Sequence, residues 1–161
     1  MTHPVKAKVH ERRSAGNPAR VSPSLPASFE DTWPAVAESV PRARHAVIAH
    51  LREAATPDPP LSDVALAVSE AVSNVVNHAY AGDATPGSVR VGLGVTPEEI
   101  RLTVEDDGGG LVPRLDSPGM GLGLPLIAHV ADRFDTRTAP GEGTRLCVWF
   151  RRDPAEATLK D

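Results

Sequence analysis

The sequence predicts an α+β fold, a two-layer sandwich in which helices cover one face of a mixed, mostly antiparallel sheet. Three observations support this class. Two helical patterns come early in the chain, two alternating apolar runs follow them as a hairpin, and a further helix and two strands come last. Strands that follow one another closely pair directly, so this order favours an antiparallel sheet with its helices gathered on one side.

A short strand and two helices are expected first. Residues 25–31 have strand character, but Pro26 has no N–H to donate, so this strand belongs at a sheet edge. Apolar residues recur at helical spacing over 34–54, and a proline-rich turn at 56–60 ends that helix. The second helix is expected over residues 61–80.

Alternation and turn residues define the hairpin and the C-terminal elements. Alternating apolar residues predict strands over 89–95 and 100–105, joined by a tight turn. A third helix is expected over 122–132, and two further strands over 133–138 and 144–151. No internal repeat interrupts this order, so one domain accounts for all of these elements.

Composition limits the classes of protein that this chain can be. Its 161 residues suit one domain, and 17 basic against 21 acidic residues give a net charge of -4, which argues against a generally basic nucleic-acid coat. The apolar stretches are shorter than the roughly 20 residues of a membrane helix, and no secretory signal pattern is present. The one cysteine, Cys147, excludes an internal disulfide and a multi-cysteine zinc site, and we interpret it as a small core residue. We therefore expect a cytoplasmic protein with no membrane contact and no direct contact to nucleic acid through its folded part.

The uneven distribution of charge indicates tails at both ends. Residues 1–24 contain five Lys or Arg and one Glu, a net of +4, with several Pro residues and few apolar ones. This composition is typical of a disordered basic tail, which either contacts nucleic acid or an acidic partner or is only a solvated terminus. We expect the folded domain over 25–152 and a C-terminal tail over 153–161.

The second helix carries a polar stripe opposite its apolar face. At about 100° per residue, Glu70, Asn74 and Asn77 fall on one side of the helix, and eight apolar residues fall on the other. Surface exposure explains this stripe about as well as function does, although each Asn costs about half a kcal/mol relative to Ala in a helix. A carboxylate and an amide one turn apart can hold Mg²⁺ together with water and phosphate oxygens.

Three glycine clusters follow in the second half of the chain. They are 106–110 after a strand, 119–124 at the start of the third helix, and 141–144 before the last strand. Glycine lets a backbone approach a ligand closely, and a helix start offers free N–H groups to phosphate. The clusters either form turns only or build a nucleotide site. The P-loop, the dinucleotide fingerprint and the hydrolase nucleophile elbow are all absent from the sequence.

The order and content of these motifs resemble the GHKL, or Bergerat-fold, histidine-kinase-like ATPases and, among them, the RsbW-like anti-sigma-factor serine/threonine kinases. The segment 69–80 resembles the N box, 106–110 the G1 box, 119–124 the G2 box, and 141–144 the third glycine motif. The resemblance covers 35–151. It implies the Bergerat fold and two cofactors, ATP and Mg²⁺.

The resemblance also implies roles for single residues. Glu70 matches the general base of the kinase members, Asn74 matches the Mg²⁺ ligand, and Asp106 matches the acid that binds the adenine amino group. The glycines of the G2 box match the hinge of a lid over the phosphates. The full set of implied nucleotide-binding residues is Asn74, Asn77, Asp106, Gly108, Gly110, Gly119, Gly121, Leu122, Gly123 and Thr144.

Partner binding is implied by the same resemblance. Arg44 in the first helix aligns with an arginine that contacts the sigma factor in these kinases. Independently of the resemblance, Arg114 is the only Lys or Arg between 102 and 132, and it either stabilises phosphate or is a solvated loop residue. The resemblance implies a homodimer that binds a sigma factor and phosphorylates a serine of an anti-sigma-factor antagonist protein. One alternative is a catalytically inactive, ATP- or ADP-dependent partner switch of the same fold. Another is a plain interaction scaffold whose glycines only form turns.

Overall fold

The structure is a computed structural model that describes residues 29–54, 61–109, 123–139 and 141–152. The elements in chain order are β1 (Phe29–Pro34), α1 (Ser39–Glu53), α2 (Leu61–Asn74), the π-helical turn η1 (Val75–Ala79), β2 (Ser88–Val95), β3 (Glu99–Asp106), α3 (Gly123–Val130), β4 (Arg133–Ala139) and β5 (Gly143–Arg151). The two expected tails, 1–24 and 153–161, lie outside the described residues. No helix within the described ranges is long and apolar enough to cross a membrane.

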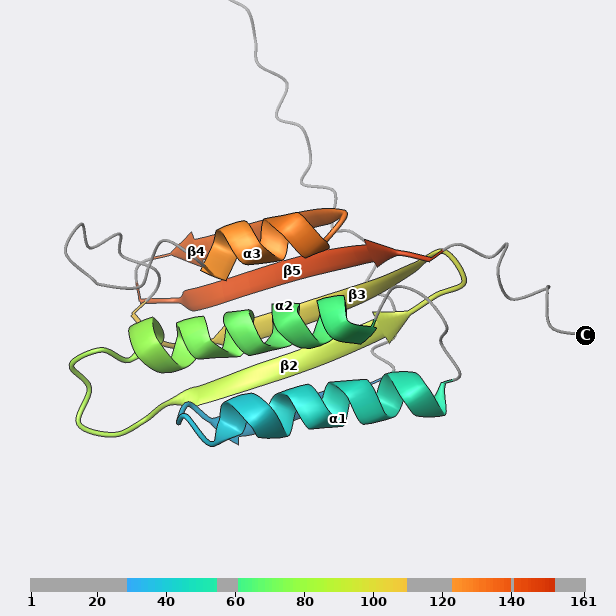
Figure 1. Ribbon diagram of the computed structural model, residues 1–161. Helices are drawn as coiled ribbons and strands as arrows, with labels where there is room; N and C mark the ends of the chain where they lie inside the picture. The colour runs from blue at the N-terminus through green and yellow to red at the C-terminus, as the bar shows by residue number, and fades with distance from the viewer. Residues whose placement is uncertain (1–28, 55–60, 110–122, 140, 153–161) are drawn as a thin grey trace, which may run out of the picture.

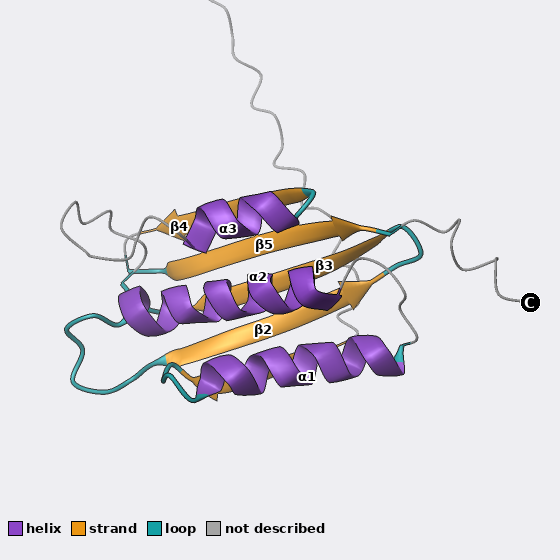
Figure 2. Ribbon diagram, in the orientation of Figure 1, coloured by secondary structure: helices purple, strands orange, loops and turns teal. Residues whose placement is uncertain are grey.

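Helices and strands form two layers. The five strands form one sheet in the order β1-β2-β3-β5-β4, and every pairing in it is antiparallel. All three α-helices lie on the same face of this sheet, with α2 between α1 and α3 (Figures 1 and 2). The predicted α+β sandwich with helices on one face is confirmed. The first strand is an edge strand as expected, but it ends at Pro34 rather than at residue 31.

The core fills the space between the two layers. Alternate residues of β2, β3 and β5 point into it, as the period-two pattern of each strand predicts. The helices supply the opposite wall. The largest fully buried side chains are Val47 and Leu51 of α1, Val64, Val68 and Val72 of α2, Ile127 of α3, Val89, Val91 and Leu93 of β2, Ile100 and Leu102 of β3, and Phe150 of β5. Because α2 buries one face against the middle of the sheet, the rotation of the helix about its axis is fixed. The directions in which its polar side chains point are therefore fixed as well.

The second helix departs from the prediction at its C-terminal end. The regular α-helix ends at Asn74, and the next five residues form the π-turn η1 rather than a continuation to residue 80. Val75 and Ala79 of this turn are buried, so the wider turn still packs on the core. Single π-turns inside helices cost hydrogen-bond quality and are frequent at functional sites.

The sheet face that points away from the helices corrects one expectation. Cys147 alternates along β5 with the buried residues Leu146 and Val148, so its side chain lies on the opposite face and not in the core. Trp149 shares this face, and the Arg133 guanidinium lies 4.0 Å above the centre of its ring system. No described element covers this face, and charged and aromatic side chains line much of it.

Candidate functional site

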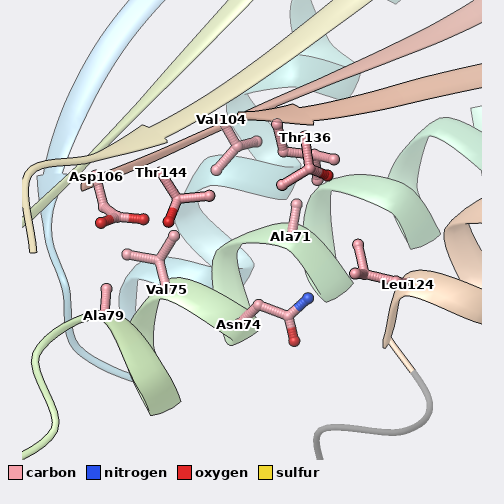
Figure 3. Close-up of a pocket in the computed structure, with 10 residues that line it drawn as sticks. Ala71, Asn74, Val75, Ala79, Val104, Asp106, Leu124, Thr136 and Thr144 are labelled. Atoms are coloured by element: carbon pink, nitrogen blue, oxygen red, sulfur yellow. The ribbon is translucent and has the colours of Figure 1, made fainter. Parts of the chain in front are cut away.

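A pocket lies between α2, η1 and the helix-facing side of the sheet (Figure 3). Its lining residues are Ala71, Asn74, Val75, Ala79, Val104, Asp106, Leu124, Thr136, Thr144 and Leu146. The empty space, including the open mouth, is about 410 Å³. The pocket is therefore a narrow slot with mainly apolar walls and a few polar groups, which is the usual composition of a small-molecule site.

Asp106 supplies the acidic group of the slot. It is the last residue of β3 and pairs with Thr144 at the start of β5. Its Oδ1 accepts a hydrogen bond from the Gly108 N–H at 3.0 Å. Burial raises the pKa of the Asp106 carboxyl above its ordinary value, whereas hydrogen bonds from the backbone of Gly108 and Thr144 act in the opposite direction. A half-buried carboxylate at the rim of an apolar slot can accept hydrogen bonds from a ligand's N–H groups.

Two glycines permit the close backbone packing around Asp106. A Cβ on Gly108 would lie 2.2 Å from the Ala79 carbonyl oxygen, and one on Gly143 would lie 1.9 Å from the Asp106 carbonyl oxygen. Gly143 also has a φ of +77°, which favours glycine. The Gly109 N–H donates to the Ala79 carbonyl at 2.9 Å. The G1 segment is therefore fixed directly against the end of η1.

Tyr80 ties three segments together at the same end of the slot. Its hydroxyl oxygen accepts hydrogen bonds from the backbone N–H groups of Ser88, at 3.1 Å, and Asp107, at 3.2 Å. The hydroxyl proton can go to the Ser88 carbonyl, at 2.7 Å, or to the Asp107 carboxylate. Burial raises the pKa of the Tyr80 phenol, and the hydrogen bond to the Asp107 side chain raises it further. Tyr80 thus fixes the residue next to Asp106.

Asn74 lies on the side of the slot near α3. A Cβ on Gly123 would come within 2.9 Å of both terminal atoms of the Asn74 amide, so the start of α3 lies directly against this side chain. Leu124 continues the wall on the same side (Figure 3). The structure thus brings together the N-box amide and a G2-box glycine, which the sequence separates by 49 positions.

The other two residues of the predicted polar stripe are outside the slot. Glu70 is half-buried one helical turn before Asn74, and Asn77 is exposed on η1. Neither lines the pocket. Glu70 and Asn74 are one turn apart in the regular α-helix and so share its face, whereas Asn77 lies within the π-turn that follows Asn74.

Arg44 connects α1 to the N box. Its Nη1 donates a hydrogen bond to the Ser69 hydroxyl at 3.3 Å, and that hydroxyl donates to the Ala65 carbonyl at 2.8 Å. Ser69 immediately precedes Glu70. The predicted partner residue is therefore half-buried beside the segment that carries the predicted general base.

Most of the predicted lid residues are not among those that the structure describes. Gly110, Arg114, Gly119, Gly121 and Leu122 lie outside the described residues, and with them most of the expected lid. Of the predicted nucleotide-binding residues that are described, Asn74, Asp106 and Thr144 line the slot, and Gly108, Gly123 and Asn77 do not.

The sequence prediction missed Thr136 and the role of Tyr80. Thr136 lies on β4 and lines the slot beside the predicted residue Thr144. A threonine at a core-facing position of a strand, between Phe134 and Thr138 on the same face, is the signal that could have identified it. Tyr80 was part of the N-box segment, but its contacts depend on residues far away in the sequence.

The slot suits a flat, nitrogen-rich ring. Its apolar walls can cover the two faces of such a ring, and Asp106 can accept a hydrogen bond from an amino group on its edge. Asn74, at the mouth near α3, offers an amide oxygen of the type that Mg²⁺ takes as a ligand. The described residues contain no group of three or more His, Cys, Asp or Glu that could bind a metal without other ligands. A cation here would need phosphate or water oxygens as well.

Comparison with protein families identifies the family of this chain. The family model of the histidine kinase-like ATPase domain matches residues 33–151. The chain belongs to this family. The predicted resemblance to the GHKL ATPases is therefore confirmed over nearly the whole described region.

Curated relatives support the RsbW-like branch of the family. An anti-sigma F factor from Pasteuria penetrans is 34% identical over 96 residues, which cover 52% of this chain and 63% of that protein. An anti-sigma F factor from Clostridium novyi is 30% identical over 117 residues, covering 66% of this chain and 81% of that protein. The serine-protein kinase RsbW of Oceanobacillus iheyensis is 40% identical over 48 residues, which are 30% of each chain. The first of these matches spans less than two thirds of the relative's length.

Proposed function

We propose that this protein is an ATP-binding anti-sigma-factor serine/threonine kinase of the cytoplasm, which binds a sigma factor and phosphorylates a serine of an antagonist protein. The observation that carries the proposal is the position of Asp106 at the rim of a narrow apolar slot whose other side carries Asn74. Relatives named anti-sigma F factor and serine-protein kinase support the partner and the chemistry.

In this proposal the adenine of ATP occupies the slot. The Asp106 carboxylate accepts a hydrogen bond from the amino group of the base, while the side chains of Val75, Ala79 and Leu146 cover its faces. GTP has a carbonyl oxygen where ATP has this amino group, so the same carboxylate would face an acceptor. The site should therefore select ATP and ADP over GTP.

The phosphates extend from the slot toward Asn74 and the start of α3. The Asn74 amide oxygen would hold Mg²⁺, which supplies positive charge to the phosphates when bound. Gly123 leaves room for this amide because a side chain there would collide with it. Free N–H groups at the start of a helix favour phosphate at this end of the slot.

Glu70 would act as the general base. In the transfer step the serine oxygen of the antagonist bonds to the γ-phosphorus, and the bond from that phosphorus to the bridging oxygen of ADP breaks. The serine proton goes to the Glu70 carboxylate. Because Glu70 is half-buried and outside the adenine slot, it can face an incoming substrate without contacting the base.

We place the partner surface on α1 and the neighbouring part of α2. Arg44 contacts Ser69, the residue before Glu70, so a protein bound at Arg44 would lie near the segment that carries Glu70. We also propose that the protein acts as a homodimer, as the family resemblance implies. The basic tail 1–24 has no assigned role in this proposal.

Transfer of phosphate to serine tests the proposal. The wild-type protein and Glu70→Gln are incubated with saturating Mg²⁺-ATP and candidate antagonists from the same genome, and phosphoserine is measured. A general base contributes about 10²- to 10⁴-fold to a rate, so we expect Glu70→Gln to bind ATP normally and to transfer phosphate at least about 100-fold more slowly. Glu98→Gln, at an exposed turn between β2 and β3, is the matched control and should behave like the wild type.

The result also separates the kinase from the partner switch. If the wild-type protein binds ATP and a sigma factor but phosphorylates no cognate antagonist, the kinase proposal is wrong and the inactive switch replaces it. If Glu70→Gln transfers phosphate at the wild-type rate, another group is the base.

A further inference from the structure

One polar atom inside the slot has no described partner. Thr136 lies on β4 opposite Leu146 of β5, on the helix-facing side of the sheet, and it lines the slot. Its hydroxyl oxygen is buried and makes no hydrogen bond with any residue that the structure describes. Figure 3 shows Thr136 beyond Thr144 as seen from Asp106.

The isolation of this hydroxyl is unusual within its own strand. Thr138, the next residue on the same face, has its hydroxyl within 3.3 Å of both the Gly143 carbonyl oxygen and the Thr144 hydroxyl. Buried polar groups are nearly always paired, and an unpaired one needs an explanation such as a bound ligand or an ordered water. Two other buried side-chain atoms share this condition among the described residues, Ser39 Oγ and Arg101 Nε, but neither lines the slot.

We propose that the Thr136 hydroxyl is a specificity-determining contact that hydrogen-bonds the base of the bound nucleotide, directly or through one water. This inference rests on the proposed function. It extends it by assigning a base contact on β4, a strand that none of the predicted motifs includes.

The chemistry of the base complements the two side chains. The amino group of adenine donates hydrogen bonds, and ionised Asp106 can only accept them. The ring nitrogens of adenine accept hydrogen bonds, and a carboxylate cannot satisfy them. A hydroxyl can donate, so Thr136 supplies the donor that Asp106 lacks. The contact also removes the cost of an unpaired buried hydroxyl, so part of the binding free energy comes from relief of that cost.

Removal of the hydroxyl should have opposite effects on stability and on binding. Thr136→Val keeps the size and the β-branched shape but has no hydroxyl. Without nucleotide, the variant loses an unpaired buried polar group, so its thermal unfolding midpoint should rise. The affinity for ATP should fall roughly 3- to 10-fold because one neutral hydrogen bond is lost. Adenosine, which has no phosphates, should lose affinity by the same factor, because the contact is to the base.

Two further variants separate this role from a structural one. Ser39→Ala removes another unpaired buried hydroxyl, on α1 and away from the slot, so it should raise the midpoint and leave ATP affinity unchanged. Thr136→Ser keeps the hydroxyl and should retain wild-type affinity. Calorimetry gives the affinities, and thermal unfolding without nucleotide gives the midpoints.

Three results would overturn the inference while the wild-type protein still binds ATP. The first is unchanged ATP affinity in Thr136→Val. The second is a loss with ATP but not with adenosine, which would place the contact on the phosphates. The third is a lower midpoint in Thr136→Val without nucleotide, which would mean that the hydroxyl is already paired. If the wild-type protein binds no ATP, the proposed function fails instead, and that outcome is distinct from all three.

Discussion

A single carboxylate, Asp106, links the chemistry of the slot to pH. Its pKa is raised mainly by burial, and two backbone N–H groups act against that rise. The ionised form is the better acceptor for the amino group of adenine. Because its pKa is raised, Asp106 gains a proton at a higher pH than an ordinary aspartate does. Nucleotide binding through its carboxylate should therefore be sensitive to acid.

We expect ATP affinity to fall on acidification earlier than an ordinary aspartate would cause. As the pH falls through the raised pKa of Asp106, the carboxylate gains a proton and the hydrogen bond to the base weakens. Calorimetric titrations from neutral to mildly acidic pH measure this, with Asp106→Asn as the variant that should lose this part of the pH dependence. The same profile in both proteins would mean that another group controls binding.

The contribution of Asp106 to the stability of the free protein should change with pH in the opposite direction to ATP affinity: it should increase as the pH falls. A raised pKa means that the folded state holds the Asp106 proton more tightly than the unfolded chain does. The contribution of Asp106 to stability is therefore fully present below its unfolded pKa and is lost as the pH rises through its folded pKa. At neutral pH the buried charge is a cost, so thermal unfolding should show Asp106→Asn at least as stable as the wild type.

Asn74 should matter for the metal and not for the base. Asn74→Ala removes the amide oxygen that we assign to Mg²⁺, so the affinity for Mg²⁺-ATP should fall, whereas ADP measured without metal should bind as before. Paired calorimetric titrations of the two ligands test this. An equal loss for both nucleotides would show that Asn74 only supports the packing of α3 through its contact with Gly123.

At the scale of elements, the end of α2 and the loops after β3 act as one unit. The π-turn η1 brings the Ala79 carbonyl to the Gly109 N–H, and the next residue, Tyr80, holds the backbone of Ser88 and Asp107. Asp106 lies between these fixed points. Its carboxylate therefore has a set position before any ligand enters.

Tyr80→Phe should remove the hydrogen bonds that hold the end of α2 to the backbone of Ser88 and Asp107, and it should leave no cavity because the aromatic ring is kept. The phenyl ring still packs on Gly87, but two backbone N–H groups lose their acceptor, and we expect a loss of about 1–2 kcal/mol in the free energy of unfolding. ATP affinity should fall as well, because the Asp107 backbone next to Asp106 is no longer held. Urea unfolding and calorimetry provide the two measurements.

A matched variant at the other end of the sheet controls for general destabilisation. Thr96→Val removes a hydroxyl that accepts hydrogen bonds from two backbone N–H groups in the turn between β2 and β3. It should lower stability by a similar amount but leave ATP affinity unchanged. If the two variants lose similar amounts of stability and also lose ATP affinity by the same factor, Tyr80 has no specific effect on the slot.

Most elements could be predicted from the sequence because their patterns are local. The alternation of Val89, Val91 and Leu93 needs no long-range information, and β2 lies where it predicts. The end of α2 could not be predicted in this way. Residues 75–79 fit an α-helix by spacing. In the structure Ala79 of the π-turn contacts Gly108 and Gly109, which are distant in the sequence, so its surroundings cannot be read from a local pattern.

At the scale of the whole molecule, the predicted motifs meet because the fold stacks one helix layer on one sheet. The N-box residue Asn74, the G1-box residue Asp106 and Thr144 come from α2, β3 and β5, and they line one slot as their order in the motifs implies. Thr136 was not predicted. Alternation along its strand indicates the core-facing side, but its place beside Thr144 and the slot depends on the pairing of β4 with β5. Cys147 was wrongly assigned to the core, although alternation along β5 places it on the same face as Arg145 and Arg151.

The measurement that tests the account most directly is calorimetric titration of the wild-type protein and of Asp106→Asn with ATP, with GTP as a second ligand. The wild-type protein should bind ATP and ADP with similar affinity and GTP much more weakly. Loss of a hydrogen bond to a buried charged group costs about 1–3 kcal/mol, so Asp106→Asn should raise the dissociation constant for ATP roughly 5- to 150-fold with the fold intact. Equal affinity of the two proteins for ATP, or equal affinity of the wild type for ATP and GTP, would contradict the assignment of the slot to adenine.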